Sequence, residues 1–178
     1  LLQVNRPAKK DAYFLGAFNR DRKAILEVLH PLLTKAGIQP RFLLYSRKNR
    51  KAEGGNPCFT LTQEIYTYEQ NIAQVKNAEI IIDLTVDCHK GLSLRFFESI
   101  CFSKKLITNN DSIRYYDLYH PDNIFIYGKD DLNTLEAFIQ QPYQQVQSAI
   151  IQKYSFANWI HYALDLPPYT PIPAPELP

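Results

Sequence analysis

The sequence predicts an α/β fold with a mostly parallel sheet of about six strands. Short apolar stretches alternate with segments of helical spacing along the 178 residues, as in consecutive βαβ units. The clearest unit runs from the apolar stretch 79–84 through a polar, glycine-containing loop and a helical segment to a second strand at 105–108. Helices should cover both faces of this sheet, which gives a three-layer α/β/α sandwich.

Composition fits such a domain. With 46% hydrophobic and 21% charged residues, the chain can bury a real core, and its net charge of +2 by itself argues neither for nor against a nucleic-acid partner, which is not expected here. No apolar run approaches the roughly twenty residues of a membrane span. Three cysteines without regular spacing fit reduced thiols in the cytoplasm.

Three segments divide the chain. Residues 1–10 lack periodicity and are interpreted as a linker; because the chain contains no Met, we expect Leu1 to follow an upstream segment. Residues 11–166 form the predicted α/β lobe. The proline-rich residues 167–178 should be extended, either loose or laid along a surface.

The lobe opens with a strand at 12–16 that ends in Gly16 and leads into a helix. Pro31 is expected to kink or interrupt this helix, and Gly37 suits its C-terminal cap. The apolar positions of the helix share one face: Ile25, Leu26, Leu29, Leu32 and Leu33.

The next elements are shorter. Strands are predicted at 41–45 and near 58–61, on either side of a basic loop at 46–57 that is typical of a solvated surface. A helix is predicted over 64–77, before the strand at 79–84.

The second half of the chain continues the alternation. A short helix is predicted at 111–118 and a strand at 123–127. Helical spacing then recurs at 132–139 and, as one long final helix, at 146–164.

The loop after the strand at 79–84 carries the most informative polar residues. Gly91 permits a sharp turn, and Ser93 is a suitable helix N-cap, so backbone amides there favour an anion. Arg95 and Glu98 share one helical face and suit the phosphate and the ribose hydroxyls of a nucleotide diphosphate. An ordinary surface Arg–Glu pair explains the same spacing. Three residues of this helix are expected to face the core: Leu94, Phe97 and Cys101.

The turn after the first strand is a second candidate anion site. Gly16 is followed by Asn19 and Arg20, which could face phosphates, whereas Arg22 and Lys23 are more simply explained as helix surface. The turn lacks both the G-x-G-x-x-G fingerprint and a P-loop, which argues against NAD enzymes and P-loop NTPases.

A metal site is not expected. Asp83, Asp87, Cys88 and His89 lie close together in sequence, but adjacent Cys and His without a second ligand pair are poor zinc spacing. His89 is interpreted as a polar contact to a ligand or as a solvated loop residue. Tyr127 ends a strand that should reach the same edge as this loop, unlike the other tyrosines, which suit packing.

At residues 90–98 and 104–109, the sequence resembles the nucleotide-sugar-binding segment of GT-B-fold glycosyltransferases, most closely the bacterial lipopolysaccharide and capsular polysaccharide enzymes. The resemblance covers most of 11–164 and is specific only within 83–109. It implies a Rossmann-like, donor-binding C-terminal lobe. One departure concerns the family's pair of glutamates seven residues apart, because position 91 holds Gly in place of the first and leaves the sugar contacts unassigned.

The resemblance also implies roles for individual residues. Gly91 to Ser93, with Arg95, would hold the donor diphosphate, Glu98 the ribose, and the Asn19–Arg20 turn further phosphate contacts. The complete expected donor-binding set is Gly16, Asn19, Arg20, His89, Gly91, Leu92, Ser93, Arg95, Glu98 and Tyr127.

The reaction implied by the resemblance is transfer of a sugar from a nucleotide sugar to a glycan or glycolipid acceptor, without cofactor or metal. The catalytic base would come from an N-terminal acceptor-binding lobe that this chain lacks, so the chain alone should be inactive. The family is cytoplasmic, and its members can associate peripherally with the inner membrane.

Two alternatives remain open. One is a non-catalytic Rossmann-like binding module, for example a receiver-like domain, although the first strand is followed by basic rather than acidic residues. The other is an epimerase-like enzyme that also binds a nucleotide sugar.

Overall fold

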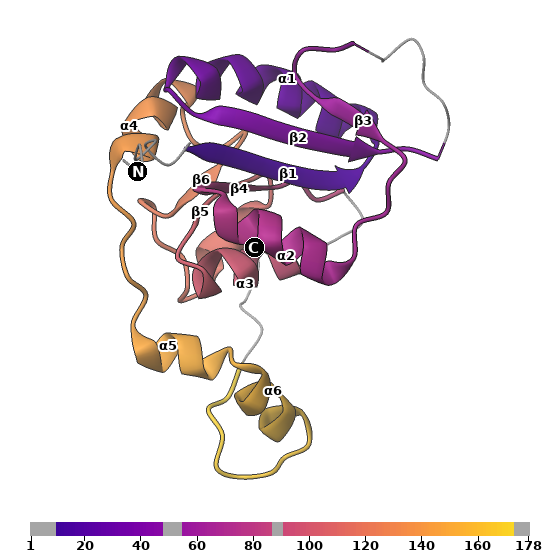
Figure 1. The fold of residues 1–178 in the computed structure, drawn as a ribbon. Helices are drawn as coiled ribbons and strands as arrows, with labels where there is room; N and C mark the ends of the chain where they lie inside the picture. The colour runs from indigo at the N-terminus through magenta and orange to yellow at the C-terminus, as the bar shows by residue number, and fades with distance from the viewer. Residues whose placement is uncertain (1–9, 48–54, 87–90, 173–178) are drawn as a thin grey trace, which may run out of the picture.

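The computed structural model of the chain describes residues 10–47, 55–86 and 91–172, and these form an α/β structure around one sheet (Figure 1). All pairings in the sheet are parallel, and the six strands have the order β3-β2-β1-β4-β5-β6. The strands are β1 (Asp11–Ala17), β2 (Gln39–Tyr45), β3 (Thr60–Thr62), β4 (Ile80–Asp83), β5 (Lys105–Thr108) and β6 (Ile124–Ile126). The predicted Rossmann-like fold with a parallel sheet of about six strands is confirmed.

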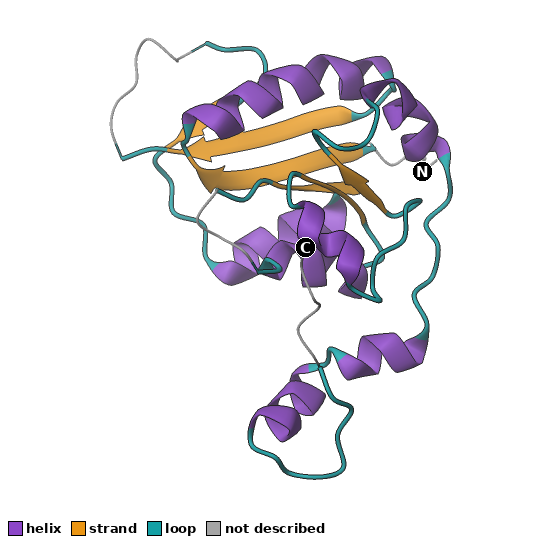
Figure 2. Cartoon of the chain, turned by 180° about the vertical axis from the view of Figure 1, so that it is seen from behind, coloured by secondary structure: helices purple, strands orange, loops and turns teal. Residues whose placement is uncertain are grey.

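Helices cover both faces of the sheet (Figures 1 and 2). One face carries α1 (Arg20–Lys35) and α4 (Leu135–Gln140), and the other carries α2 (Tyr68–Asn77) and α3 (Leu94–Cys101). Two 3₁₀ helices, η2 (Asp111–Tyr115) and η3 (Leu132–Thr134), flank β6 along the chain. The last two helices, α5 (Ser148–Lys153) and α6 (Phe156–Ala163), stand away from the sheet. None of the helices in the described ranges combines the length and the apolar character needed to cross a membrane.

The core is divided by the sheet into two layers. Along β4, Ile80 and Ile82 pack against the α1 and α4 side, and Ile81 packs against the α2 and α3 side. This alternation follows from the two-residue period of a strand. Because both faces are covered, the central strands β4, β5 and β6 are fully buried and mostly apolar, which is why they could be recognised as short apolar runs.

Helix α1 continues through Pro31 to Lys35, so the predicted interruption is wrong. Leu29 and Leu33 lie on either side of the proline and are fully buried, and their burial offsets a proline penalty of about 3 kcal/mol. The predicted cap at Gly37 is confirmed: this residue has φ +80°, its N–H donates to Thr34 O at 3.0 Å, and the following N–H of Ile38 donates to Leu33 O at 2.9 Å.

Two helix boundaries differ from the prediction. Helix α2 begins at Tyr68 rather than near residue 64, because Thr67 and Gln70 form a reciprocal capping box. The expected long final helix is two helices. Ser155 accepts a hydrogen bond from the N–H of Asn158 and starts α6, while the Asn158 side chain donates to Lys153 O at the end of α5.

The core-facing side of α3 was also predicted wrongly. Leu94 is 60% exposed and Cys101 is exposed, whereas Phe96 and Ile100 are buried against the sheet. Phe97 is only partly buried. The helix begins at Leu94, directly after the Ser93 cap, and the residues it buries are Phe96, Glu98, Ser99 and Ile100.

Beyond α6, the described part of the tail lies against the helix. The N–H of Thr170 donates to Asn158 Oδ1 at 2.7 Å, and Asn158 Nδ2 donates to Thr170 O at 2.8 Å. The predicted linker, apart from Lys10, and the end of the tail lie outside the described residues.

Candidate ligand site at the carboxyl edge of the sheet

Strand order places the candidate site between β1 and β4. After β1 the chain enters α1 on one face of the sheet, and after β4 it leads to α3 on the other face (Figure 1). In open parallel sheets, ligands bind outside the carboxyl ends of the strands at this kind of reversal. Both loops that carried the sequence predictions therefore flank one point of the sheet.

The turn after β1 is organised by Asn19. Its Oδ1 accepts hydrogen bonds from the N–H of Asp21 at 2.7 Å and of Arg22 at 3.4 Å, so its side chain caps α1. Arg20, the first residue of the helix, is exposed. Of these two predicted phosphate contacts, Arg20 presents its side chain to solvent, and Asn19 is engaged by its own helix.

Arg22 bridges the carboxyl ends of β1 and β4. Its Nε donates to Leu84 O at 2.9 Å and its Nη1 donates to Ala17 O at 3.1 Å. Burial lowers the pKa of this guanidinium, and the neighbouring carboxyl of Asp83 acts in the opposite direction. The interpretation of Arg22 as helix surface is therefore wrong.

Gly16 makes room for the ring of Phe14, beside the Arg22 bridge. A Cβ at this position would lie 2.8 Å from Phe14 Cζ and 3.5 Å from Arg22 Nη1. Gly16, predicted as part of a candidate anion-binding turn, thus allows a close approach within the protein.

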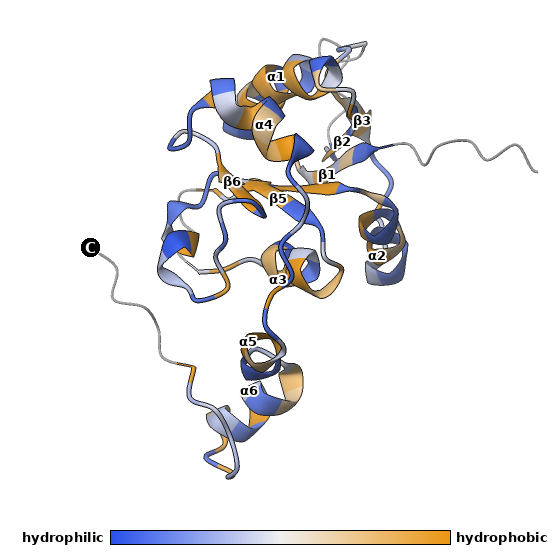
Figure 3. Cartoon of the chain, turned by 90° about the vertical axis from the view of Figure 1, so that its left-hand side faces the viewer, coloured by the Kyte–Doolittle hydropathy of each residue, from blue (hydrophilic) through white to orange (hydrophobic). Residues whose placement is uncertain are grey.

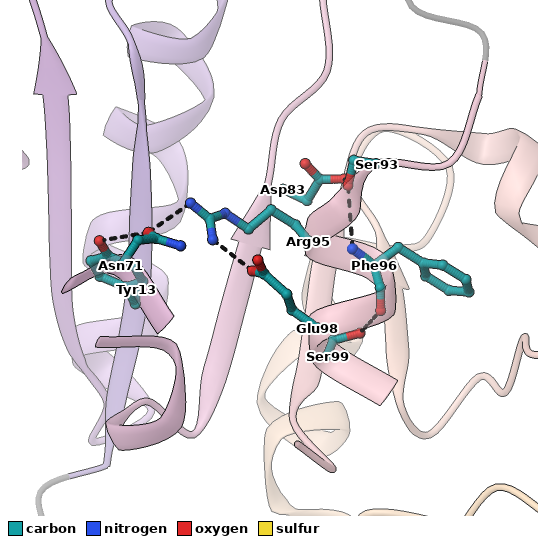
Figure 4. Close-up of polar contacts among 8 residues, drawn as sticks. All are labelled: Tyr13, Asn71, Asp83, Ser93, Arg95, Phe96, Glu98 and Ser99. Atoms are coloured by element: carbon teal, nitrogen blue, oxygen red, sulfur yellow. Dashed lines mark hydrogen bonds and ion pairs between the residues drawn. The ribbon is translucent and has the colours of Figure 1, made fainter. Parts of the chain in front are cut away.

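Ser93 links the end of β4 to the start of α3. Its Oγ donates to Asp83 Oδ2 at 2.6 Å and accepts from the N–H of Phe96 at 3.2 Å, which confirms the predicted N-cap (Figure 4). Burial raises the pKa of Asp83, while the Ser93 hydrogen bond and the charges of Arg95 and Arg22 oppose that shift. The side chain of Asp83 thus ties the end of β4 to the start of α3.

Arg95 and Glu98 do share one face of α3, as predicted, but they point along the sheet toward α2 (Figure 4). Arg95 Nη1 lies 2.6 Å from Glu98 Oε2, and Nη2 donates to Asn71 Oδ1 at 2.7 Å. Asn71 Oδ1 also accepts from the hydroxyl of Tyr13 at 3.2 Å, and burial raises the pKa of Tyr13 to about 12.

This network is interior. Glu98 is 4% exposed, and its Oε1 is buried without a hydrogen-bond partner among the described residues. A solvated Arg–Glu pair is therefore excluded. In this arrangement the Glu98 carboxylate is not open to ribose hydroxyls, because Arg95 lies on Oε2 and Oε1 is buried.

A hollow of about 350 Å³ lies beside Gly16. It opens at the carboxyl ends of β1 and β2, and the segment after β3 forms its other wall. Its lining is Leu15, Gly16, Ala17, Tyr45, Arg47, Glu64, Ile65 and Tyr66. Sequence reasoning missed this feature because it assigned Tyr66 to packing and placed Ile65 in a predicted helix; Ile65 precedes α2 and is 77% exposed, which the sequence pattern does not indicate.

Two asparagines that follow β5 bind the described ends of the loop between β4 and α3. Asn109 Oδ1 accepts from the N–H of Thr85 at 2.8 Å, and Asn109 Nδ2 donates to Thr85 O at 3.1 Å. Asn110 Nδ2 donates to Gly91 O at 3.1 Å. Both described ends of the loop are therefore fixed relative to β5.

The remaining predicted contacts are dispersed. Leu92 is partly buried against the α2 and α3 side of the core. Tyr127 reaches the carboxyl edge, where its N–H donates to Thr108 O at 2.7 Å, but its ring packs against the opposite side of the core. His89 lies outside the described residues, as do Asp87 and Cys88. Within the described ranges, no group of three His, Cys, Asp or Glu residues could hold a metal ion.

Comparison of the sequence with known protein families finds no matching family model, and no curated protein matches it either. Function therefore has to be argued from the site. The carboxyl edge combines an exposed cation at Arg20, the starts of α1 and α3, and an apolar hollow with Tyr45 and Tyr66 in its wall. This chemistry suits a ligand with one planar apolar part and one anionic part.

Proposed function

We propose that the chain is the donor-binding lobe of a GT-B-type glycosyltransferase and holds a nucleotide sugar at the switch between β1 and β4. The observation that carries the proposal is the adjacency of the apolar hollow and the basic first turn, which share Gly16. A nucleoside diphosphate needs an apolar hollow and a basic turn close to each other, because its base is planar and its phosphates are charged.

In this arrangement the base enters the hollow between Tyr45 and Tyr66. The diphosphate lies across the starts of α1 and α3, where the helix dipoles and Arg20 offset its charge. Arg22 holds the carboxyl ends of β1 and β4 at a fixed separation beneath the diphosphate. On this proposal Gly91 and Ser93, at the approach to α3, also lie beside the phosphates.

The role of Arg95 and Glu98 follows from their network. When the donor binds, Arg95 turns from Glu98 to the diphosphate, and Glu98 then accepts the ribose hydroxyls. Asn71 loses its contact with Arg95 in the same step. Donor binding on this proposal is coupled to the contact between α2 and α3.

Transfer to a glycan or glycolipid acceptor requires a catalytic base, which on this proposal comes from an N-terminal acceptor-binding lobe. The leaving diphosphate is stabilised by helix dipoles and arginines, with no cofactor. The complete enzyme would be cytoplasmic and associate peripherally with the inner membrane. The chain alone should bind a donor and transfer nothing.

The test is a ligand panel. UDP, GDP, ADP, CMP and their sugars are added to the chain while its melting temperature is followed, because a ligand that binds only the folded state raises it. We expect one nucleotide diphosphate and its sugar to raise the melting temperature, and Arg20→Ala to reduce the effect. If no nucleotide changes the melting temperature, the proposal is wrong.

A further inference from the structure

Helix α6 presents an unusual distribution of side chains. Its apolar residues recur at the spacing i, i+3, i+4, i+7, i+8, which is the stripe that a helix normally buries. These residues are Phe156, Trp159, Ile160, Ala163 and Leu164. Every one of them is exposed, with Phe156 at 73%, Trp159 at 53% and Leu164 at 61%.

The inward side of the same helix is polar. Asn158 exchanges two hydrogen bonds with the backbone of Thr170, and Ser155 caps the helix. Both residues, with His161, are less exposed than the apolar stripe. The helix therefore turns its polar side toward its own tail and its apolar side toward solvent, the reverse of an ordinary surface helix.

The position of α6 leaves the stripe accessible. Figure 3 shows α5 and α6 standing apart from the sheet and its covering helices. Helix α5 is tied back to the body by the ion pair of Lys153 with Asp117 at 2.8 Å and by the contact of Tyr154 with Phe97. Helix α6 has no buried residue. A contiguous exposed apolar surface of this kind marks a contact site.

Charge decides what kind of contact fits. Between residues 154 and 172, the only Asp, Glu, Lys or Arg is Asp165, which accepts a hydrogen bond from the hydroxyl of Tyr169 at 2.5 Å. A helix that lies on a membrane usually has Lys and Arg on its polar side; α6 has neither. An uncharged stripe can face an identical stripe across a two-fold axis without opposing like charges.

We propose that a second copy of this chain covers the apolar face of α6, so that the protein self-associates through antiparallel α6 helices. Trp159 and Ile160, in the middle of α6, lie in the centre of that contact, and Phe156, whose ring stacks on Trp159 at 5.8 Å, lies at its end. Because one short helix and its flanks bury less than about 1,200 Å², the dimer should be weak, with a dissociation constant in the micromolar range.

Trp159 is the only tryptophan in the chain, so its fluorescence reports on this face alone. Sedimentation velocity and tryptophan emission are measured from micromolar to millimolar protein. We expect a monomer–dimer equilibrium, with a blue shift of the emission over the same concentration range. A monomer at every concentration, with unshifted emission, would overturn the proposal.

Substitutions of opposite charge at Ile160 provide the matched variants. Ile160→Asp and Ile160→Lys should each be monomeric with an unchanged melting temperature, and an equal mixture of the two should dimerise again. Val28→Asp is the control, because Val28 of α1 is 38% exposed and Ile160 is 36% exposed; this variant should dimerise like the parent. Dimers that persist in Ile160→Asp would contradict the proposal.

A lipid surface is the alternative occupant. Vesicles of phosphatidylcholine are added to the protein below its dimerisation range. We expect no blue shift of Trp159 and no co-sedimentation with the vesicles. A blue shift caused by vesicles, without any dimer in solution, would assign the face to a membrane and overturn the proposal.

Discussion

The Nε of Arg22 lies 2.9 Å from the backbone oxygen of Leu84, 62 positions further along the chain. A second bond from the same guanidinium reaches Ala17 O at 3.1 Å. One side chain of α1 thus fixes the separation between β1 and β4 at the point where the proposed donor binds.

Replacing Arg22 should therefore reduce stability. Arg22→Ala leaves two backbone oxygens without their charged donor, and we expect the free energy of unfolding to fall by about 2–3 kcal/mol. Urea denaturation measures this change. Arg20→Ala is the matched control and should alter stability by less than about 0.5 kcal/mol, because Arg20 is an exposed residue of the same helix turn. Equal losses in the two variants would refute the structural role of Arg22.

Asp83 should make stability depend on pH in the acidic range. Burial raises its pKa in the folded protein above the unfolded value of about 3.9, so its contribution is fully present below that value and is lost as pH rises through the folded pKa. Asp83→Asn keeps an acceptor for Ser93 but does not titrate. Relative to the parent, this variant should gain stability between acidic and neutral pH, as measured by urea denaturation across that range. A constant difference between the two proteins would contradict the raised pKa.

The pair of Arg95 and Glu98 should behave as a buried ion pair. Arg95→Leu leaves the Glu98 carboxylate buried without its partner, at an expected loss of about 3–5 kcal/mol in stability. The double variant Arg95→Leu/Glu98→Leu should recover much of this loss, because no charge is left unpaired. A double-mutant cycle measures the coupling. Additive losses would show that the two side chains are energetically independent.

The contribution of the hollow to nucleotide binding should be separable from its contribution to stability. Ile65 lines it and is 77% exposed, so Ile65→Ser should change the melting temperature of the free protein little while weakening nucleotide binding several-fold. Tyr115→Ser, at an exposed position outside the hollow, is the control and should leave nucleotide affinity unchanged. Affinity is read by isothermal titration calorimetry. Unchanged affinity in Ile65→Ser would place the base elsewhere.

Much of the fold could be predicted because it depends on local signals. The central strands contain continuous apolar runs, as at Ile80 to Ile82, and two helix ends carry their own caps, Ser93 for α3 and Gly37 for α1. These signals lie within a few residues of the structure they determine, so one sequence is sufficient to find them.

The interactions that proved unpredictable depend on tertiary structure or on competing local bonds. Arg22 meets Leu84, and Arg95 meets Asn71, only because the sheet brings distant segments together. The apolar spacing of the last helical segment is continuous, but Ser155 and Asn158 cap two separate helices within it. Periodicity does not register such side-chain bonds to the backbone.

The most direct test of the proposed donor site is a two-dimensional ¹H–¹⁵N NMR titration of the isotope-labelled chain with the nucleotide sugar selected from the panel. The account predicts that shift changes concentrate in three places: the turn around Gly16 and Ala17, the wall of the hollow at Ile65 and Tyr66, and the start of α3 at Leu94 and Arg95. Saturable changes confined to another part of the chain, or no changes at all, would contradict it.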